Sequence, residues 1–245
     1  MIKFFRRIRQ QLVSQNKFSK YMIYAIGEIV LVVVGILIAL SINNWNEGQK
    51  IKLQEKALLN NIIEDLKSDS LEFQNTLSHL QIQLKVVDEL ITQPQNLNLM
   101  KERKNLGYLR WSTTFSPITK ENNLIVISQL FNISLRSSIQ RYFRQQENTE
   151  EIVLEYSSVI LDNVRPFLSK NGINNTEALN EPNIELRTNK ILLISKLAEQ
   201  YGSTEFKQIL FELQLKTSES IQNIKELSMA NEELMLKIQE GINSY

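Results

Sequence analysis

The stretch YMIYAIGEIVLVVVGILIALSI, residues 21–42, decides the fold of this chain. It contains one ionisable residue, Glu28. A helix rises 1.5 Å per residue, so this stretch is about 33 Å long as a helix and can cross a hydrocarbon core of about 30 Å. Amphipathic rings flank it, as in the aromatic belts of membrane interfaces: Tyr21, Tyr24 and Trp45. The sequence therefore predicts a transmembrane helix over residues 21–45.

Two other interpretations of this stretch are weaker. A cleaved signal peptide has a shorter apolar core, about 7–15 residues, followed by small residues at the cleavage site. Ala39 and Ser41 resemble such a site, but the apolar run is longer and carries a glutamate. A core helix of a soluble protein needs equally apolar surroundings, which the rest of the chain lacks.

The charges on the two sides of this stretch predict its orientation. The 245-residue chain has 28 Lys and Arg against 27 Asp and Glu, yet residues 1–20 hold six bases and no acid. The positive-inside rule places residues 1–20 in the cytoplasm and the chain beyond residue 45 on the other side. No later segment is long and apolar enough to cross back, so the prediction is a single-pass protein.

Residues 1–20 also have the pattern of a short basic amphipathic helix. Phenylalanines and aliphatic residues share one side, and bases lie opposite. We expect this segment to lie in the inner-leaflet interface, with cations near anionic headgroups: Arg6, Arg7 and Arg9. A nucleic-acid role for the same charges is the weaker interpretation, because basic residues beside a span usually set topology and bind lipid.

The N-terminal block has a family resemblance. MIKFFRRIRQQL followed by NKFSKYMIYAIGEIVLVVVGILIALSINNWNE resembles an uncharacterised family of bacteroidete single-pass membrane proteins over about the first fifty residues. A weaker match is Phe115–Pro117, then Ser134–Arg136 and Tyr142–Phe143. The resemblance implies a Gram-negative inner membrane and a periplasmic domain, and it implies no activity.

Two long segments carry apolar residues at alternating spacings of four and three, which is typical of a narrow seam on a long helix. Ser70 alone interrupts the first seam, and Thr217, Ser220 and Asn231 interrupt the second. The first seam is Leu59, Ile63, Leu66, Ser70, Phe73, Leu77, Leu80, Leu84, Val87 and Ile91; the second is Phe206, Leu210, Leu213, Thr217, Ser220, Ile224, Leu227, Asn231, Leu234 and Ile238. Two interpretations of Asn231 stay open: it selects a partner register, or it is a seam position that stays wet.

The two seam helices most simply pack antiparallel and return the C-terminus towards the membrane. Between them we expect one helix from about Asn132 to Asn171, kinked by Pro166, and another over about residues 184–200. Gly and Pro together number only 11, which disfavours folds rich in turns. The predicted fold class is all-α: one transmembrane helix (21–45) followed by an elongated antiparallel bundle of about four helices (46–245).

The segment from Thr92 to Asn123 is the least regular part of the predicted bundle. It brings three aromatic residues close together: Tyr108, Trp111 and Phe115. Such a loop is a candidate partner-binding loop, because exposed aromatic side chains are frequent anchors at interfaces. The alternative, which we favour here, is that the three rings close the distal end of the bundle.

Composition excludes most site chemistry. The chain has no Cys and one His, so a zinc site or a Ser-His-Asp triad is not expected, and the seven glycines form no phosphate-binding loop. His79 lies off the seam and is expected to face solvent, as are the acids Glu64, Asp65, Asp69 and Glu72. We therefore expect no catalytic residue, no metal and no cofactor.

Glu28 is the unusual residue of the span, since a carboxylate inside a bilayer costs about 2.5–3.5 kcal/mol. Residues at helical spacing from it share its face, and the Gly-x-x-x-Ala pair among them permits close helix approach: Val32, Gly35 and Ala39. The prediction is a helix–helix contact within the membrane, in a homo-oligomer or with another membrane protein. The alternative is a protonated Glu28 reaching towards the nearby interface, with the small residues incidental.

These features lead to a leading functional hypothesis and two rivals. The leading hypothesis is a non-enzymatic inner-membrane accessory or scaffold protein, whose periplasmic bundle binds a membrane or periplasmic protein partner. The first rival is a sensory or ligand-binding bundle that signals through a separate membrane protein, since about 20 cytoplasmic residues are too few for a transmitter domain. An enzyme ranks third, because no catalytic pattern is present.

Overall fold

The computed structural model describes residues 18–92 and 104–243, except the side chains of residues 18, 20, 21 and 24. Several predicted interfacial groups therefore lie outside the described residues: Arg6, Arg7, Arg9 and the rings of Tyr21 and Tyr24. Among the predicted interfacial side chains, Trp45 is described, and it is exposed.

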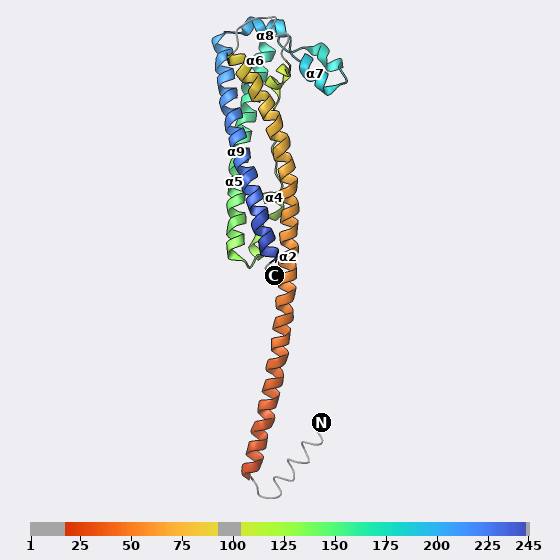
Figure 1. Cartoon of the computed structure of the whole chain (residues 1–245), viewed down its shortest axis with the longest axis vertical. Helices are drawn as coiled ribbons and strands as arrows, with labels where there is room; N and C mark the ends of the chain where they lie inside the picture. Colours follow the sequence, from red (N-terminus) through yellow and green to blue (C-terminus); the bar gives the residue numbers. More distant parts are fainter. Residues whose placement is uncertain (1–17, 93–103, 244–245) are drawn as a thin grey trace. The chain divides into compact units, whose positions relative to one another are not determined.

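Within the described residues every regular element is helical (Figure 1). The elements are α2 (Phe18–Thr92), η1 (Leu106–Arg110), α4 (Thr119–Asn123), η2 (Val126–Gln129), α5 (Ile133–Ser158), η3 (Val159–Val164), α6 (Arg165–Lys170), η4 (Thr176–Asn180), α7 (Ile184–Lys190), α8 (Ile194–Gln200) and α9 (Thr204–Asn243). Extended pairing in the described chain amounts to one isolated antiparallel bridge, Asn174 with Leu192. The all-α prediction with a long apolar N-terminal helix is confirmed.

The chain divides into two compact units, residues 1–55 and residues 56–245, and α2 contributes to both. In the first unit, the part of α2 that starts at Ala25 contains an 18-residue window of mean hydropathy 2.7, none of it buried. It is the one helix in the described residues that is long and apolar enough to cross a membrane. Its apolar side chains are exposed, for example Ile23 at 72% and Leu31 at 74%.

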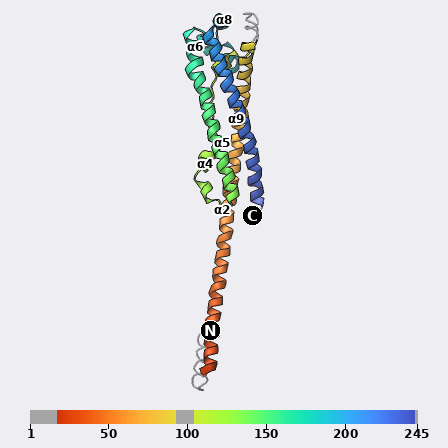
Figure 2. The same ribbon diagram turned by 90° about the vertical axis from the view of Figure 1, so that its left-hand side faces the viewer.

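The second unit is built on three long helical stretches: the last part of α2, the run α5–η3–α6, and α9. Asn231 of α9 donates to the carbonyl of Leu66, and Gln214 donates to Asp88, so α9 runs antiparallel to α2. Asn231 also donates to Tyr142 of α5, and Lys216 pairs with Glu155, so α9 runs antiparallel to α5 as well. Figures 1 and 2 show α5 and α9 side by side.

The two predicted seams are the core-facing edges of their helices. Every predicted position of the α9 seam is buried, including the polar Thr217, Ser220 and Asn231. On α2 the seam is buried or half-buried from Leu59 to Val87, and Ile91 at its end is exposed. Residues beside the α2 seam are buried too, so that face is wider than a two-stranded seam requires: Ile62, Asp69, Thr76, Gln83, Val86 and Leu90.

The antiparallel four-helix arrangement is not confirmed. Residues 184–200 form two short helices, α7 and α8, instead of one long helix. The chain between them pairs with the loop after α6: Leu193 donates to the carbonyl of Ile173, and Asn175 donates to that of Ile191. Because these backbone groups bond to the loop after α6, they cannot continue a helix from α7 into α8. Leu192, between the two helices, is buried.

The predicted kink near Pro166 takes the form of a π-helical turn, η3, immediately before the proline. A proline has no N–H to donate to the carbonyl four residues earlier, and a local change of helix type absorbs the missing bond. The helix begins as expected at Asn132, whose side chain accepts from the N–H of Leu135. Two glycines follow helices in the left-handed region, Gly172 at φ 62° and Gly202 at φ 89°.

Candidate functional site

The predicted helix contact of the span lies on an open face of α2. Val32 is 55% exposed, and a methyl group added at Gly35 meets no atom within 4 Å. Glu28 is half-buried. This face has room for a second helix to approach, and the contact through Glu28, Val32, Gly35 and Ala39 stays a prediction.

The three aromatic residues of the connecting segment, residues 104–123, pack along α2. The Trp111 ring lies 4.9 Å from His79 and 6.2 Å from Tyr108, and the Phe115 ring lies 5.6 Å from Phe73. Phe115 is buried, while Tyr108, Trp111 and His79 are half-buried. The expectation that His79 faces solvent is therefore wrong, because the ring supports Trp111. Whether Tyr108 and Trp111 also anchor a partner stays a prediction.

Two buried side chains fix the start of the connecting segment. Gln83 of α2 donates to the carbonyl oxygens of Tyr108 and Trp111, at 2.6 and 3.1 Å. Tyr156 of α5 donates to the Gln83 side-chain oxygen at 2.5 Å and to the Trp111 carbonyl at 3.1 Å. Burial raises the pKa of the Tyr156 hydroxyl, which stays a donor. The network satisfies the Trp111 carbonyl and gives a second donor to the Tyr108 carbonyl, which also accepts from the N–H of Trp111.

An acidic row on α2 holds the next part of the segment. Asp69 accepts from the N–H of Ile118 at 2.7 Å, and from the N–H and hydroxyl of Thr119 at 3.1 and 2.5 Å. Glu72 accepts from the N–H of Ser116 at 2.8 Å. Asp69 is 1% exposed, so the expectation that this residue faces solvent is wrong. Glu64, with its side chain 72% exposed, does face solvent.

The same row has unusual protonation behaviour. Burial raises the pKa of Asp69 above its ordinary value, against the opposing effect of the bonds from Thr119 and Ile118. Burial also raises the pKa of Glu72. Charge repulsion from Asp69 and Glu150 raises this pKa further. Each carboxylate is nonetheless matched to backbone donors, which is the arrangement expected of a structural acceptor row. Within residues 18–92 and 104–243, no three acidic or histidine side chains gather in a way that could hold a metal ion.

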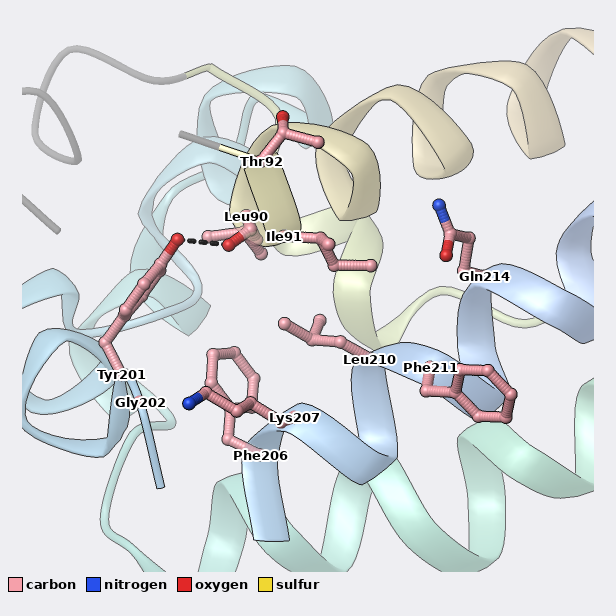
Figure 3. Close-up of a pocket in the computed structure, with 10 residues that line it drawn as sticks. All are labelled: Leu90, Ile91, Thr92, Tyr201, Gly202, Phe206, Lys207, Leu210, Phe211 and Gln214. Atoms are coloured by element: carbon pink, nitrogen blue, oxygen red, sulfur yellow. Dashed lines mark hydrogen bonds between the residues drawn. The ribbon is translucent and has the colours of Figure 1, made fainter. Parts of the chain in front are cut away.

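A groove of about 470 Å³, here called the α2–α9 groove, opens between the end of α2 and the start of α9 (Figure 3). Its walls are mostly apolar, and the large aliphatic and aromatic residues among its lining are Leu90, Ile91, Tyr201, Phe206, Leu210 and Phe211. Ile91 and Phe211 are 45% and 54% exposed, so large apolar side chains border the opening.

The walls of the α2–α9 groove are held by specific contacts. The Tyr201 hydroxyl donates to the carbonyl of Leu90, as Figure 3 shows. The ring of Phe206 stacks on Phe167 of α6 at 5.3 Å. Lys207 also lines the groove, and within the described part of the chain its ammonium forms no ion pair. The groove therefore combines a built apolar wall with a lysine that has no ion-pair partner among the described residues.

Sequence reasoning missed several residues that organise these sites. Gln83 and Asp69 lie one position before a seam residue, and Tyr156 and Gln146 lie on α5, a helix for which no seam was predicted. Gln146 donates to the carbonyl of Pro117 at 2.8 Å and accepts from the N–H of Lys120 at 3.3 Å. Periodicity detects apolar faces, so a polar residue beside a seam gives no signal until its distant partner is known.

Residues 28–114 match the model of a family of unknown function, DUF6090. The match begins within the candidate span and ends just before Phe115, and it covers about a third of the chain. No curated protein and no solved structure matches the chain. The resemblance to an uncharacterised family is thus supported in part, while the bacteroidete origin and the single-pass topology stay predictions.

Proposed function

We propose that this chain is a non-enzymatic, membrane-anchored accessory protein whose second unit binds a protein partner. The span anchors it in the inner, cytoplasmic membrane with residues 1–20 in the cytoplasm. Residues beyond the span form a periplasmic domain. The partner is a membrane or periplasmic protein, or a second copy of the chain.

The anchoring part of the proposal is supported by exposed apolar surface in the first unit. From Ile29 to Leu40 nearly every residue is a large aliphatic side chain at least 46% exposed. Such a surface is unfavourable in water by about 25 cal/mol per Å², and a bilayer removes that cost. The six bases of residues 1–20 favour the cytoplasmic side for that end.

The observation that carries partner binding is the α2–α9 groove. Soluble surfaces rarely keep large apolar side chains together around a cavity without a use for them. Ile91 and Phe211 border a recess of about 470 Å³, which suits insertion of an apolar anchor side chain from a partner. Lys207 adds a charge that favours an acidic residue on the partner, because it has no carboxylate partner among the described residues.

The test is a groove variant compared with a matched surface variant. We expect Phe211→Glu to abolish recovery of a stoichiometric partner after cross-linking in cells, detergent solubilisation, affinity purification and mass spectrometry. Met229→Glu is the control, since Met229 is an exposed apolar residue of the same helix and does not line the groove. Equal recovery from both variants would exclude the groove as the docking site.

A ligand-binding or sensory bundle is the second candidate, and the same groove favours it. A volume of about 470 Å³ lies within the range of small-molecule pockets, about 300–1,000 Å³. Native mass spectrometry of the detergent-solubilised chain separates the two functions. A bound small molecule that Phe211→Glu removes, with no protein partner recovered, would support the ligand-binding function instead.

A further inference from the structure

A second groove, here called the hydroxyl groove, lies between the connecting segment and the run α5–η3. Its volume is about 410 Å³, and it shares no lining residue with the α2–α9 groove. Residues 112–116 form one wall, which carries four hydroxyl groups, and Ser157 of α5 adds a fifth. The helical wall is apolar and includes Val153, Leu154 and Leu161. Leu154 and Leu161 are 71% and 48% exposed, so solvent reaches this wall.

The wall of residues 112–116 is an extended stretch of backbone. The carbonyl of Trp111, just before it, accepts from Gln83 of α2, and the N–H of Ser116 donates to Glu72 of the same helix. Eleven residues of α2 separate these two partners, which is about 16 Å at 1.5 Å per residue. The five steps from Trp111 to Ser116 therefore cover about 3.3 Å each, the rise of a β-strand.

This extended stretch has free backbone donors. The N–H groups of residues 112–115 form no hydrogen bond within the described chain. The Thr113 carbonyl accepts from the Ser157 hydroxyl at 2.8 Å, which ties the stretch to α5. Alternate N–H groups of an extended chain point to the same side, so two of the four face the same way. Free donors with this spacing are what an incoming strand uses when it pairs with an exposed edge.

The end of the hydroxyl groove near Ser116 is acidic. Glu150 of α5 lines the groove and also an adjoining recess around Ser116. Glu72 accepts from the Ser116 N–H, and its charge and that of Glu150 repel each other. Neither carboxylate forms an ion pair within residues 18–92 and 104–243. Two further acids lie at this end: Asp69, which accepts from Ile118 and Thr119, and Glu121.

The bases around the hydroxyl groove are already engaged. Lys120 lines the adjoining recess and pairs with Glu147 at 3.0 Å. Arg165 donates to the Ser112 hydroxyl at 2.9 Å and to the Arg110 carbonyl at 3.1 Å, at the opposite end from Glu150. The acidic end therefore keeps an excess of negative charge, which favours a cationic group on whatever enters the groove.

We propose that the hydroxyl groove binds an extended peptide of a protein partner, which pairs with free N–H groups of residues 112–115 and places a lysine or arginine side chain at Glu150. Alternate side chains of such a strand point to the same face, so apolar residues of the peptide contact Leu154 and Leu161. This site is separate from the α2–α9 groove. It goes beyond the proposed function, which does not depend on it.

The probe is a phage-displayed library of short random peptides, selected on the purified full chain in detergent micelles, with empty micelles as background. Binding of the selected peptides to the natural chain and to two variants is then measured by fluorescence polarisation. We expect peptides that carry lysine or arginine, and we expect Glu150→Gln to weaken their binding about tenfold. An amide oxygen can still accept from Gln146, which donates to Glu150, so the fold is retained. Glu151→Gln is the matched control, because Glu151 is exposed and does not line the groove.

Hydrogen exchange measured by mass spectrometry tests the strand pairing. We expect a bound peptide to slow the exchange of the amides of residues 112–115, while those of η4, residues 176–180, keep their rate. Unchanged exchange at residues 112–115 with the peptide bound would overturn the pairing.

Three other results would overturn the proposal: no peptide enriched above empty micelles, selected peptides without a basic residue, or equal affinity of the natural chain and Glu150→Gln. None of them affects the α2–α9 groove, which Phe211→Glu tests separately.

Discussion

At the scale of single residues, polar side chains inside the second unit decide how its elements fit together. Asn231 is fully buried and donates to the carbonyl of Leu66 and to Tyr142, at 3.1 and 3.0 Å. Ser70 donates to its oxygen at 3.1 Å, so the polar interruptions of the two seams meet each other. The wet interpretation of Asn231 is wrong, because the residue is fully buried. Its role in selecting the register stays a prediction.

Replacing Asn231 tests that role. We expect Asn231→Ala to lower the free energy of unfolding by about 1–3 kcal/mol, because it removes buried hydrogen bonds with the Leu66 carbonyl and with the Tyr142 and Ser70 hydroxyls. Urea unfolding followed by circular dichroism measures the change. Met229→Ala, an exposed neighbour, is expected to stay within about 0.5 kcal/mol of the natural chain.

Gly107 is a residue at which any side chain collides with α7. A methyl group added there would lie 2.0 Å from the carbonyl oxygen of Thr188 and 2.8 Å from Ile191. We expect Gly107→Ala to destabilise the packing of η1 on α7 by about 1–3 kcal/mol. Urea unfolding followed by the fluorescence of Trp111, in a Trp45→Phe background, measures this loss of stability. The corresponding change at Gly48, where an added methyl meets no atom, is not expected to destabilise the chain.

The carboxyl groups of Asp69 and Glu72 are expected to make the stability of the fold depend on pH. Their pKa values are raised in the folded chain, so the folded state binds protons more readily than the unfolded state. Their contribution to stability therefore increases as pH falls from neutral towards the ordinary values of 3.8 and 4.5. Urea midpoints of the natural chain and of Asp69→Asn, measured across this range, should show a weaker acid stabilisation in the variant. If the urea midpoints of both proteins changed equally with pH, the proposed contribution of Asp69 would be wrong.

At the scale of elements, the connecting segment takes the place that a fourth long helix was expected to fill. It runs antiparallel to α2, since Trp111 bonds to Gln83, Ser116 to Glu72, and Thr119 to Asp69. An irregular segment can pack there because α2 and α5 supply side-chain partners for its backbone groups. Its placement therefore depends on a few side chains more than on its own helix propensity.

Removing one of those side chains should loosen the segment. We expect Gln83→Ala to speed chymotrypsin cleavage after Tyr108 or Trp111, because both carbonyls and the Tyr156 hydroxyl lose a partner. Mass spectrometry of the fragments over time identifies the bond that is cut. Gln81→Ala, on the exposed side of the same helix, should leave the cleavage rate unchanged.

At the scale of the whole molecule, a net charge of +1 conceals two regions of opposite sign. Residues 1–20 hold six of the 28 bases, and the remaining residues hold all 27 acids. This separation across the apolar stretch is the basis of the proposed orientation. It also distinguishes a basic segment before the apolar stretch from an acidic region after it.

Charge reversal at the N-terminus tests the orientation. An alkaline phosphatase fused after Tyr245 should be active in the natural chain, because the enzyme needs an oxidising compartment for its disulfides. We expect Arg6→Glu, Arg7→Glu and Arg9→Glu together to reduce that activity severalfold by weakening the positive-inside bias. Immunoblotting normalises for the amount of fusion. Undiminished activity would show that these arginines do not set the topology.

The sequence by itself determined the helical class, the candidate span and the two seams, because each is a local pattern of apolar spacing on one helix. Tertiary structure alone decided the burial of Asp69 and Gln83, the break between α7 and α8, and the course of the connecting segment. It also decided the α2–α9 groove. Periodicity reveals which face of a helix avoids water. The partner of a buried polar group lies tens of residues away, so only packing brings the two together.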